Sequence, residues 1–326
     1  MDFLGRVRAR ADARTTVYHD SSAAHEGRPR PSSGIAGSES MKAIIPSAGL
    51  GTRFLPVTKA QPKEMLPIVD KPVIQYVIEE AVQAGVDDIL LITGRGKRAI
   101  EDHFDRSVEL EELLERAGAH DKLRQIRNIS ELADIFYVRQ KRPRGLGHAV
   151  MCGAAHVCDE PFFVLLGDVI VPRHDCLPRL KAVHEKYGGS VLAVTPVEPA
   201  LVSRYGVIAG HEVEPGVWEV TDLVEKPAVN EAPSTLAIFG RYLLTPAIME
   251  ILPKIRPGRG DEIQLTDALR ELLKTQSIHA VVEEDPGFDT GNILAWLEAN
   301  ISLALRSPEH GPALRVVLER LLSDEE

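Results

Sequence analysis

A glycine-rich turn that directly follows a short apolar run is the feature that most constrains this chain. The run is residues 43–45 (AII), and the turn is residues 47–53 (SAGLGTR). Three cations, Arg53, Lys59 and Lys63, lie in and just after the turn. Glycines let backbone N–H groups approach an anion, and arginine and lysine add positive charge. The stretch therefore predicts a buried strand that leads into a loop able to hold a phosphate chain.

Two common phosphate-binding motifs do not fit this turn. A P-loop needs a glycine followed by lysine and then serine or threonine, and this string does not occur in the sequence. A dinucleotide-binding fingerprint needs a third glycine, where this chain has Phe54, and a helix directly after the turn, which Pro56 and Pro62 oppose. Asp70, about twenty residues downstream, keeps dinucleotide binding as an alternative, and a plain surface turn is another. We favour a phosphate cradle outside both motifs.

The string GLGTRFLP-x-TKAQPKEMLPIVDKPVIQYV, which begins at Gly49, resembles the signature loop of the bacterial UTP–glucose-1-phosphate uridylyltransferases. These enzymes belong to the sugar-1-phosphate nucleotidylyltransferase family, and the resemblance extends from Met41 to about Leu305. It implies transfer of a uridylyl group from UTP to glucose-1-phosphate, with release of pyrophosphate and with Mg²⁺ as the cofactor. It also implies that the turn binds the nucleotide through four residues: Ala48, Gly49, Gly51 and Thr52.

The resemblance assigns further residues along the chain. The catalytic cations are Arg53 and Lys63, which hold the β- and γ-phosphates, and Lys226, which holds the sugar phosphate. Gly206 and Glu225 bind the sugar, and Gln140 and Gly145 hold the uracil and ribose. A side-chain amide suits uracil, which presents an N3–H donor between two carbonyl acceptors. On the residues alone, Glu225-Lys226-Pro227 also fits a surface turn, and His148 fits a capping or packing residue better than a catalyst.

Two aspartates are candidate magnesium ligands. The apolar run at residues 162–166 leads straight into Asp168, and a carboxylate at the carboxyl end of a buried strand lies where open α/β sheets bind ligands. A capping role for Asp168 is disfavoured because the next helix is predicted near Asp175. Magnesium commonly takes one carboxylate together with substrate phosphates. Asp289, before a helix that runs to about Leu303, fits either a helix N-cap or a second magnesium ligand.

Apolar periodicity predicts an α/β fold: a Rossmann-like, mostly parallel sheet with helices on both faces and an added antiparallel portion. The resemblance implies that this added portion binds the sugar. Asp261 and Gln264 predict a capping box, and the string at residues 257–268 is assigned to helix architecture near the sugar pocket. A solvated pair of helices is predicted at residues 97–133. The predicted strands are residues 43–45, 86–93, 135–138, 162–166, 190–194, 205–209, 217–224 and 236–239.

Composition divides the chain and limits its partners. Residues 1–40 are rich in Arg, Ala, Ser, Gly and Pro and predict a disordered extension. Residues 41–305 form the predicted catalytic domain, and residues 306–326 a helical tail. A net charge of −10 argues against a nucleic-acid partner, and the absence of an apolar run near eighteen residues argues against a membrane span. Three cysteines without CxxC spacing, Cys152, Cys158 and Cys176, predict buried thiols in a reducing compartment.

We therefore expect a cytoplasmic enzyme whose partners are UTP and glucose-1-phosphate. The resemblance adds a homodimer or homotetramer. Two alternatives stay open: a related enzyme that uses dTTP, CTP or ATP, because phosphate-binding groups do not encode the base, and a non-catalytic sensor of sugar nucleotides.

Overall fold

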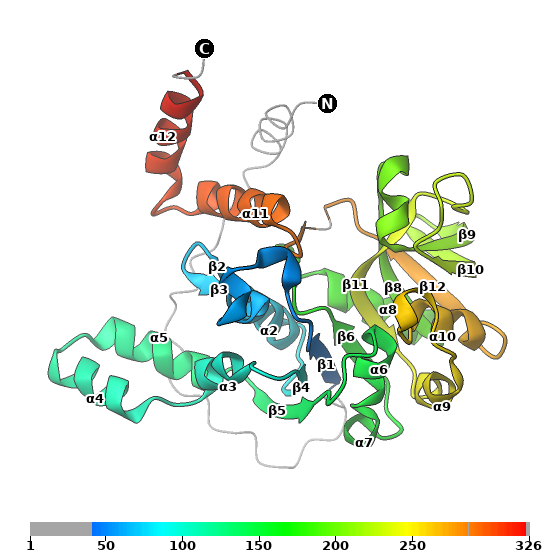
Figure 1. The fold of residues 1–326 in the computed structure, drawn as a ribbon, viewed down its shortest axis with the longest axis horizontal. Helices are drawn as coiled ribbons and strands as arrows, with labels where there is room; N and C mark the ends of the chain where they lie inside the picture. The colour runs from blue at the N-terminus through cyan, green and yellow to red at the C-terminus, as the bar shows by residue number, and fades with distance from the viewer. Residues whose placement is uncertain (1–40, 286, 324–326) are drawn as a thin grey trace. The chain divides into compact units, whose positions relative to one another are not determined.

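The computed structural model describes residues 41–285 and 287–323, with the Arg259 side chain excepted (Figure 1). The predicted disordered extension, residues 1–40, lies outside the described residues. The compact unit that carries the predicted site is Ser40–Leu303. It includes most of α11 (Ile293–Arg306), whereas α12 (Gly311–Ser323) lies outside it. No helix within the described ranges combines the length and the apolar character that a membrane span requires.

A nine-stranded sheet forms the centre of the compact unit (Figure 1). Its first four strands pair in parallel in the order β5-β4-β1-β6, so the chain turns outward in both directions from β1. Ligands bind at such a reversal point, beyond the carboxyl ends of the strands, in doubly wound α/β folds. The strands are β1 (Lys42–Ser47), β4 (Asp88–Thr93), β5 (Asp134–Arg139) and β6 (Phe162–Leu165).

The rest of the sheet mixes strand directions. β11 is antiparallel to β6 and β8, β12 is parallel to β8, and β10 is antiparallel to β12 and β9. The predicted antiparallel portion is therefore present, but β12 fills its centre and was not among the predicted strands. These strands are β8 (Ser190–Pro196), β9 (Gly206–Glu214), β10 (Val217–Glu225), β11 (Leu236–Leu244) and β12 (Ile278–Val282).

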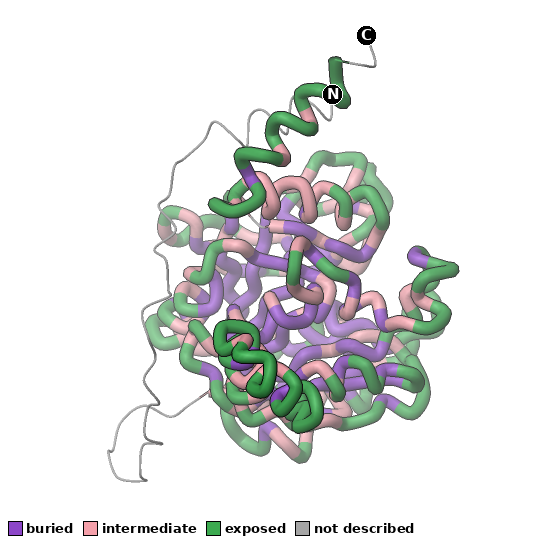
Figure 2. The backbone as a smooth tube through the Cα atoms, turned by 90° about the vertical axis from the view of Figure 1, so that its left-hand side faces the viewer, coloured by how far each residue is buried: buried purple, intermediate pink, exposed green. Residues whose placement is uncertain are grey.

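Successive residues of the buried strands point to opposite faces, and helices cover both. Ile44 of β1 packs in the cluster with α6, α9 and α10, whereas Ala43 and Ile45 pack with α2, α3 and α8. In Figure 2 the buried stretches of the backbone tube, coloured purple, lie mainly in the interior. The helices are α2 (Val73–Gln83), α3 (Arg98–Phe104), α6 (Leu146–Met151), α8 (Cys176–Tyr187), α9 (Ala247–Ile251) and α10 (Leu265–Leu272). The predicted α/β fold with helices on both faces is confirmed.

Shorter elements complete the unit. Two small antiparallel pairs lie apart from the main sheet: β2 with β3, and β7 with β13. Their bounds, with those of the remaining short helices, are β2 (Pro67–Ile68), β3 (Lys71–Pro72), β7 (Val169–Ile170), β13 (Phe288–Asp289), α7 (Ala154–Val157), η4 (Pro199–Arg204), η5 (Leu252–Lys254) and η6 (Arg259–Asp261).

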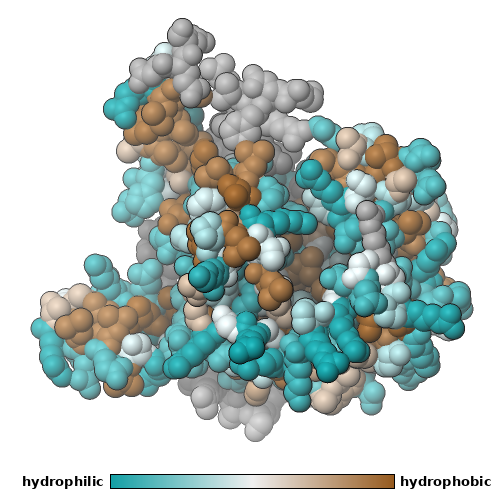
Figure 3. All heavy atoms as spheres, viewed as in Figure 1, coloured by the Kyte–Doolittle hydropathy of each residue, from teal (hydrophilic) through white to brown (hydrophobic). Residues whose placement is uncertain are grey.

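Residues 97–133 form three helices, α3, α4 (Val108–Arg116) and α5 (His120–Ser130), so the predicted pair was wrong in number. Apolar side chains also gather on the surface of α4, where Val108, Leu110 and Leu113 are exposed (Figure 3). The exposed face of α4 is therefore partly apolar, and not polar throughout as a solvated helix would be.

Two further predictions were wrong. Asp261 ends η6 with a positive φ, α10 begins only at Leu265, and no side chain caps that helix, so Asp261 and Gln264 form no capping box. The cysteines are not uniformly buried: Cys176 is buried, Cys152 is half-buried and Cys158 is exposed. The site is positioned by the buried carboxyl end of β6 and by the tight turn at the start of α6. Neither of these depends on a capping box or on the burial of the cysteines.

Candidate active site

The predicted phosphate loop leaves β1 as a series of tight turns. Gly51 has a left-handed φ of 65°, which favours glycine, and three short 3-10 helices follow instead of an α-helix. They are η1 (Thr52–Phe54), η2 (Val57–Lys59) and η3 (Lys63–Met65). The Thr58 hydroxyl donates to the Gly51 carbonyl (2.7 Å) and ties the loop to itself. A side chain on Gly49 would contact Lys63, because its Cβ would lie 3.7 Å from Lys63 Nζ.

Lys63 pairs with Asp168 at the mouth of this loop. Asp168 follows β6, the neighbour of β1, and its Oδ2 accepts a hydrogen bond from Lys63 Nζ. Burial would raise the pKa of Asp168, but the nearby Lys63 ammonium outweighs burial and holds that pKa below its usual range. Burial would lower the pKa of Lys63, and the carboxylates of Asp168 and Glu64 outweigh it and raise that pKa. Both groups are therefore charged at neutral pH.

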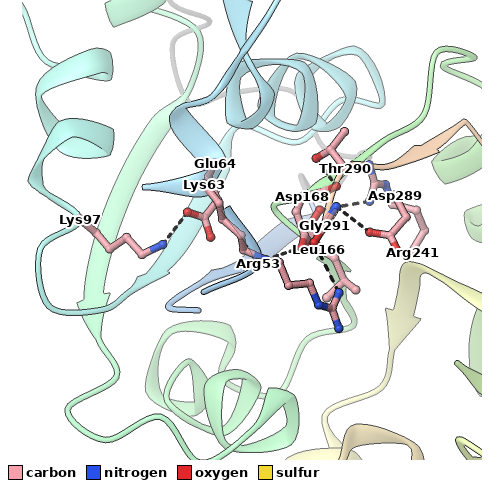
Figure 4. A network of polar contacts seen from close by, with 10 residues as sticks. All are labelled: Arg53, Lys63, Glu64, Lys97, Leu166, Asp168, Arg241, Asp289, Thr290 and Gly291. Carbon is pink, nitrogen blue, oxygen red and sulfur yellow. Dashed lines mark hydrogen bonds and ion pairs between the residues drawn. The ribbon is translucent and has the colours of Figure 1, made fainter. Parts of the chain in front are cut away.

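Asp289 lies beside Asp168 because β13 pairs with β7. A Cβ built on Gly291 would lie 2.9 Å from Asp289 Oδ1 and 3.4 Å from Asp168 Oδ2, so both carboxylates face one point. Arg53 reaches the same place, where its Nη1 donates to the Gly291 carbonyl (3.4 Å; Figure 4). Burial, and then the negative charge of Asp168, raise the pKa of Asp289.

Asp289 does not cap the following helix. The Asn292 side chain accepts from the backbone N–H of Ala295 (3.1 Å), which is the N-cap contact for a helix that begins at Ile293. Asp289 Oδ1 instead accepts from the backbone N–H of Gly291 (3.0 Å). The capping alternative for Asp289 was therefore wrong.

The paired carboxylates suit a hard cation. Two half-buried carboxylates that face one point repel each other, and oxygen ligands of this kind are those that Mg²⁺ takes. Among the described residues no group of three acidic, histidine or cysteine side chains gathers. A magnesium ion at Asp168 and Asp289 would therefore complete its coordination with water and ligand oxygens, which is usual for this ion.

Two buried ion pairs surround these residues and were not predicted. The fully buried Arg241 guanidinium bonds Glu80 (Nη2 to Oε2, 2.6 Å) and donates to the Val169 carbonyl (2.7 Å). Lys97 bonds Glu64 (2.6 Å), the residue after Lys63. The hydroxyl and the backbone N–H of Thr290 both donate to the Asp168 carbonyl. The backbone on both sides of Asp168 is thus fixed by buried donors.

The predicted sugar-binding residues Gly206 and Glu225 pair across β9 and β10, next to Thr266 of α10. Lys226 Nζ lies 3.0 Å from Glu225 Oε1, and the Thr266 hydroxyl donates to Glu225 Oε2 (2.7 Å). A Cβ on Gly206 would lie 2.7 Å from Thr266 Oγ1, so only glycine fits there. Thr266 was not singled out from the sequence, although it belongs to the string that was expected near the sugar pocket.

Tyr205 connects this group to the aspartates. The backbone N–H of Lys226 donates to the Tyr205 carbonyl (2.9 Å). Burial, followed by the negative charge of Asp289 and a hydrogen bond with it, raises the pKa of the Tyr205 phenol. Tyr205 therefore touches Lys226 through its backbone and Asp289 through its side chain, and it was not predicted as a site residue.

The predicted base-binding residues form a separate turn between β5 and α6. Gln140 is buried, and its Nε2 donates to the Gly145 carbonyl (3.2 Å) and lies 2.8 Å from His148 Nδ1. Gly145 has a φ of 92°, and a Cβ there would lie 2.7 Å from Glu262 Cβ. The Ile263 backbone also bonds this turn through its N–H and its carbonyl. Part of the string at 257–268 therefore packs against the base turn, which was not expected.

Comparison with known proteins gives one consistent result. Residues 42–305 match the protein family described as nucleotidyl transferase. The chain is 51% identical to the UTP–glucose-1-phosphate uridylyltransferase YngB of Bacillus subtilis over 87% of its own length and 96% of that protein. It is 48% identical to a UTP–glucose-1-phosphate uridylyltransferase of Staphylococcus epidermidis over 86% of its length and 98% of that protein.

Solved structures agree with the sequence relatives. A UTP-bound UGPase from Acinetobacter baumannii superimposes with a TM-score of 0.79 at 38% identity, over 86% of this chain and 99% of that one. A UDP-glucose pyrophosphorylase complexed with UDP-glucose superimposes with a TM-score of 0.74 at 44% identity, over 82% of this chain and 100% of that one.

Proposed function

The chain belongs to the nucleotidyl transferase family, and we propose that it transfers the uridylyl group of UTP to glucose-1-phosphate, giving UDP-glucose and pyrophosphate. Relatives that share about half of its residues over nearly their whole length carry this activity in their names. The observation that carries the proposal is the contact between Lys63 and Asp168 beside the glycine turn, at the point where the sheet order reverses.

The reaction needs alignment and charge more than acid–base chemistry. A phosphate monoester loses its second proton near pH ~6, so the attacking oxygen of the sugar phosphate is already ionised at neutral pH. That oxygen attacks the α-phosphorus of UTP, and pyrophosphate leaves in line with the attack. Repulsion between two anions is the barrier that the site must lower. Alignment of two bound reactants supplies up to ~7–11 kcal/mol.

The residues of the phosphate side divide this work. Arg53 and Lys63 hold the β- and γ-phosphates, with backbone N–H groups of Ala48 to Thr52 beside them. Asp168 and Asp289 would hold Mg²⁺, which neutralises phosphate charge when it is bound. Lys63 is paired with Asp168, so an incoming triphosphate offers its ammonium a second anion.

The other residues select and orient the two substrates. Gln140 and Gly145 bind the base and ribose, whereas Gly206 and Glu225 bind the sugar hydroxyls. Lys226 presents the sugar phosphate. Its backbone contact with Tyr205, whose phenol bonds Asp289, supports a location next to the phosphates.

A nucleotide panel tests this function. The enzyme is mixed with glucose-1-phosphate, Mg²⁺ and UTP, dTTP, CTP or ATP in turn, and pyrophosphate release is measured. We expect kcat/KM to be highest for UTP. A higher value with another nucleotide would assign the related enzyme instead, and no pyrophosphate with any of them would leave only a binding protein.

Lys226→Ala tests the role of the second cation. Loss of an ammonium that meets the sugar phosphate removes about 3–4 kcal/mol of stabilisation, so kcat/KM for glucose-1-phosphate should fall by about two to three orders of magnitude. Lys59→Ala, which removes an exposed lysine of the first loop, is the control. A Lys226→Ala enzyme with kcat/KM like that of the control would remove Lys226 from the site.

We also propose a cytoplasmic location, because the proposed substrate UTP is available there, and a homodimer or homotetramer. Light scattering on the purified full chain measures its mass in solution, and a monomeric mass would contradict the second proposal.

A further inference from the structure

We propose that His148 fixes the orientation of the Gln140 amide and thereby sets the preference for uracil over cytosine. This inference rests on the proposed function, because it concerns how the same site reads the base of the nucleotide. It assigns a positioning role to a histidine that touches Gln140 and no phosphate-binding group described above.

The contacts of Gln140 leave one orientation for its amide. Its nitrogen Nε2 lies 3.2 Å from the Gly145 carbonyl, and a carbonyl only accepts, so the amide must present nitrogen on that side. The same nitrogen lies 2.8 Å from His148 Nδ1, which must therefore be the unprotonated nitrogen of the ring. With 6% of Gln140 exposed, little water can replace either contact.

The orientation of the amide decides what the base meets. Among the residues that the structure describes, none donates a hydrogen bond to Gln140 Oε1, which leaves this oxygen as an acceptor for a ligand. Uracil carries a donor at N3, whereas cytosine carries an acceptor at the same atom. An acceptor fixed in place therefore binds uracil and repels cytosine, and buried polar groups of this kind discriminate strongly.

His148 can keep Nδ1 unprotonated only while the ring is neutral. Burial, and then the positive charge of Arg144, lower the pKa of His148. The other group near the ring is the Cys152 thiol, 4.0 Å from Nδ1, which carries no charge at neutral pH because burial raises its pKa. As pH falls through the lowered pKa of His148, a proton on Nδ1 would face the amide N–H, and the orientation would be lost.

Three variants separate this role from packing. His148→Leu removes the acceptor and keeps bulk. His148→Asn keeps an acceptor, Oδ1, near the place of Nδ1, and this acceptor does not titrate. Cys152→Ala changes the other neighbour of the ring without touching Gln140 and is the control.

The measurement is kcat/KM for UTP together with the inhibition constant of CTP against UTP. We expect His148→Leu to lower the preference for UTP by about three- to tenfold, the range that one hydrogen bond supplies, with kcat at saturating UTP little changed. His148→Asn and Cys152→Ala should keep the preference of the unmodified enzyme. An unchanged preference in His148→Leu would overturn the inference.

A pH series gives a second test that does not depend on the leucine variant folding. In the unmodified enzyme, KM for UTP should rise as pH falls below neutral. Protonation of the substrate phosphates contributes equally in both enzymes, so His148→Asn should show a smaller rise. An equal rise in both enzymes would overturn the inference. The proposed function is judged separately, since it fails only if the unmodified enzyme does not release pyrophosphate from UTP.

Discussion

Asp168 follows the buried strand β6 and Gln140 follows the exposed edge strand β5 of the same sheet, and different interactions hold the two residues. Around Asp168 the structure pairs charged groups: Lys63 with Asp168 itself, both half-buried, and Arg241 with Glu80, both buried. Around Gln140 the contacts are neutral, from a glycine carbonyl and an uncharged imidazole. Under the proposed function, the phosphate side meets several negative charges, whereas the base side distinguishes a donor from an acceptor.

This difference has an energetic consequence. Burying an ion costs several kcal/mol, which a well-bonded partner offsets, so a buried pair is stable only while both partners are present. A neutral hydrogen bond contributes only about 0.5–1.5 kcal/mol. The phosphate side should therefore fail abruptly when one group is removed, and the base side should lose selectivity first.

Arg241→Met is the strongest test of the comparison. It leaves Glu80 buried without its partner and frees the Val169 carbonyl, so the free energy of unfolding should fall by about 3–5 kcal/mol. Lys274→Met, which removes an exposed partner of Glu271, is the control and should cost less than about 0.5 kcal/mol. Urea unfolding measures both. Equal losses would mean that the buried pairs do not distinguish the phosphate side.

Gly145→Ala tests the base side, where backbone shape replaces charge. Alanine would keep a positive φ and place its Cβ 2.7 Å from Glu262 Cβ. We expect a stability loss of about 2–3 kcal/mol and a rise in KM for UTP of about tenfold.

Gly118→Ala is the matched control for that variant, because Gly118 also has a positive φ but a Cβ there would meet nothing within 4 Å. It should cost about 1 kcal/mol, the cost of the backbone conformation alone. If Gly145→Ala were no less stable than this control, the turn would accommodate a Cβ at residue 145 and the steric argument would be wrong.

Asp289→Asn is expected to change stability least. It tests whether a carboxylate on the phosphate side is kept at a cost to stability. Because burial and Asp168 raise its pKa in the folded state, ionised Asp289 destabilises the fold at neutral pH, and the unfolded chain releases this proton first as pH rises. The asparagine variant should therefore gain about 0.5–1 kcal/mol at pH 7, and the gain should vanish as pH falls to about 4.

Activity should change in the opposite direction. If Asp289 holds magnesium, Asp289→Asn should need more Mg²⁺ for half-maximal rate and lose about 100-fold in kcat/KM. Asp102→Asn, on the surface of α3, is the control for both measurements. A variant that is both less stable at pH 7 and fully active would contradict the account of this site.

Sequence patterns predicted the elements whose residues are contiguous in the chain. The apolar runs of β1, β4 and β6 and the glycine turn after β1 are continuous in the sequence, so their positions could be predicted. Residues 278–282 could not, because this short run contains His279 and its partners lie near residues 190 and 217. A run of this length acquires its strand identity only from those neighbours.

The buried charges of the site also depend on residues that are distant in the sequence. Asp168 could be predicted from its place after a buried strand, but the pairing of Arg241 with Glu80 joins residues 161 positions apart. Nothing local marks Arg241, which lies in a strand whose other residues are mostly apolar. Gln140 could be found by resemblance, whereas the part of His148 depends on a contact that only the fold brings about.

β12 also determines when the main sheet can be completed during synthesis. The hairpin of β9 and β10 joins the remaining sheet through β12 and through a single pair between Val207 and Ala237. A chain that grows on the ribosome has already released all of β9 to β11 before residues 278–282 emerge. Nascent chains halted before that point should therefore hold a hairpin still open to proteases, and the hairpin would join the rest of the sheet only after residues 278–282 have emerged.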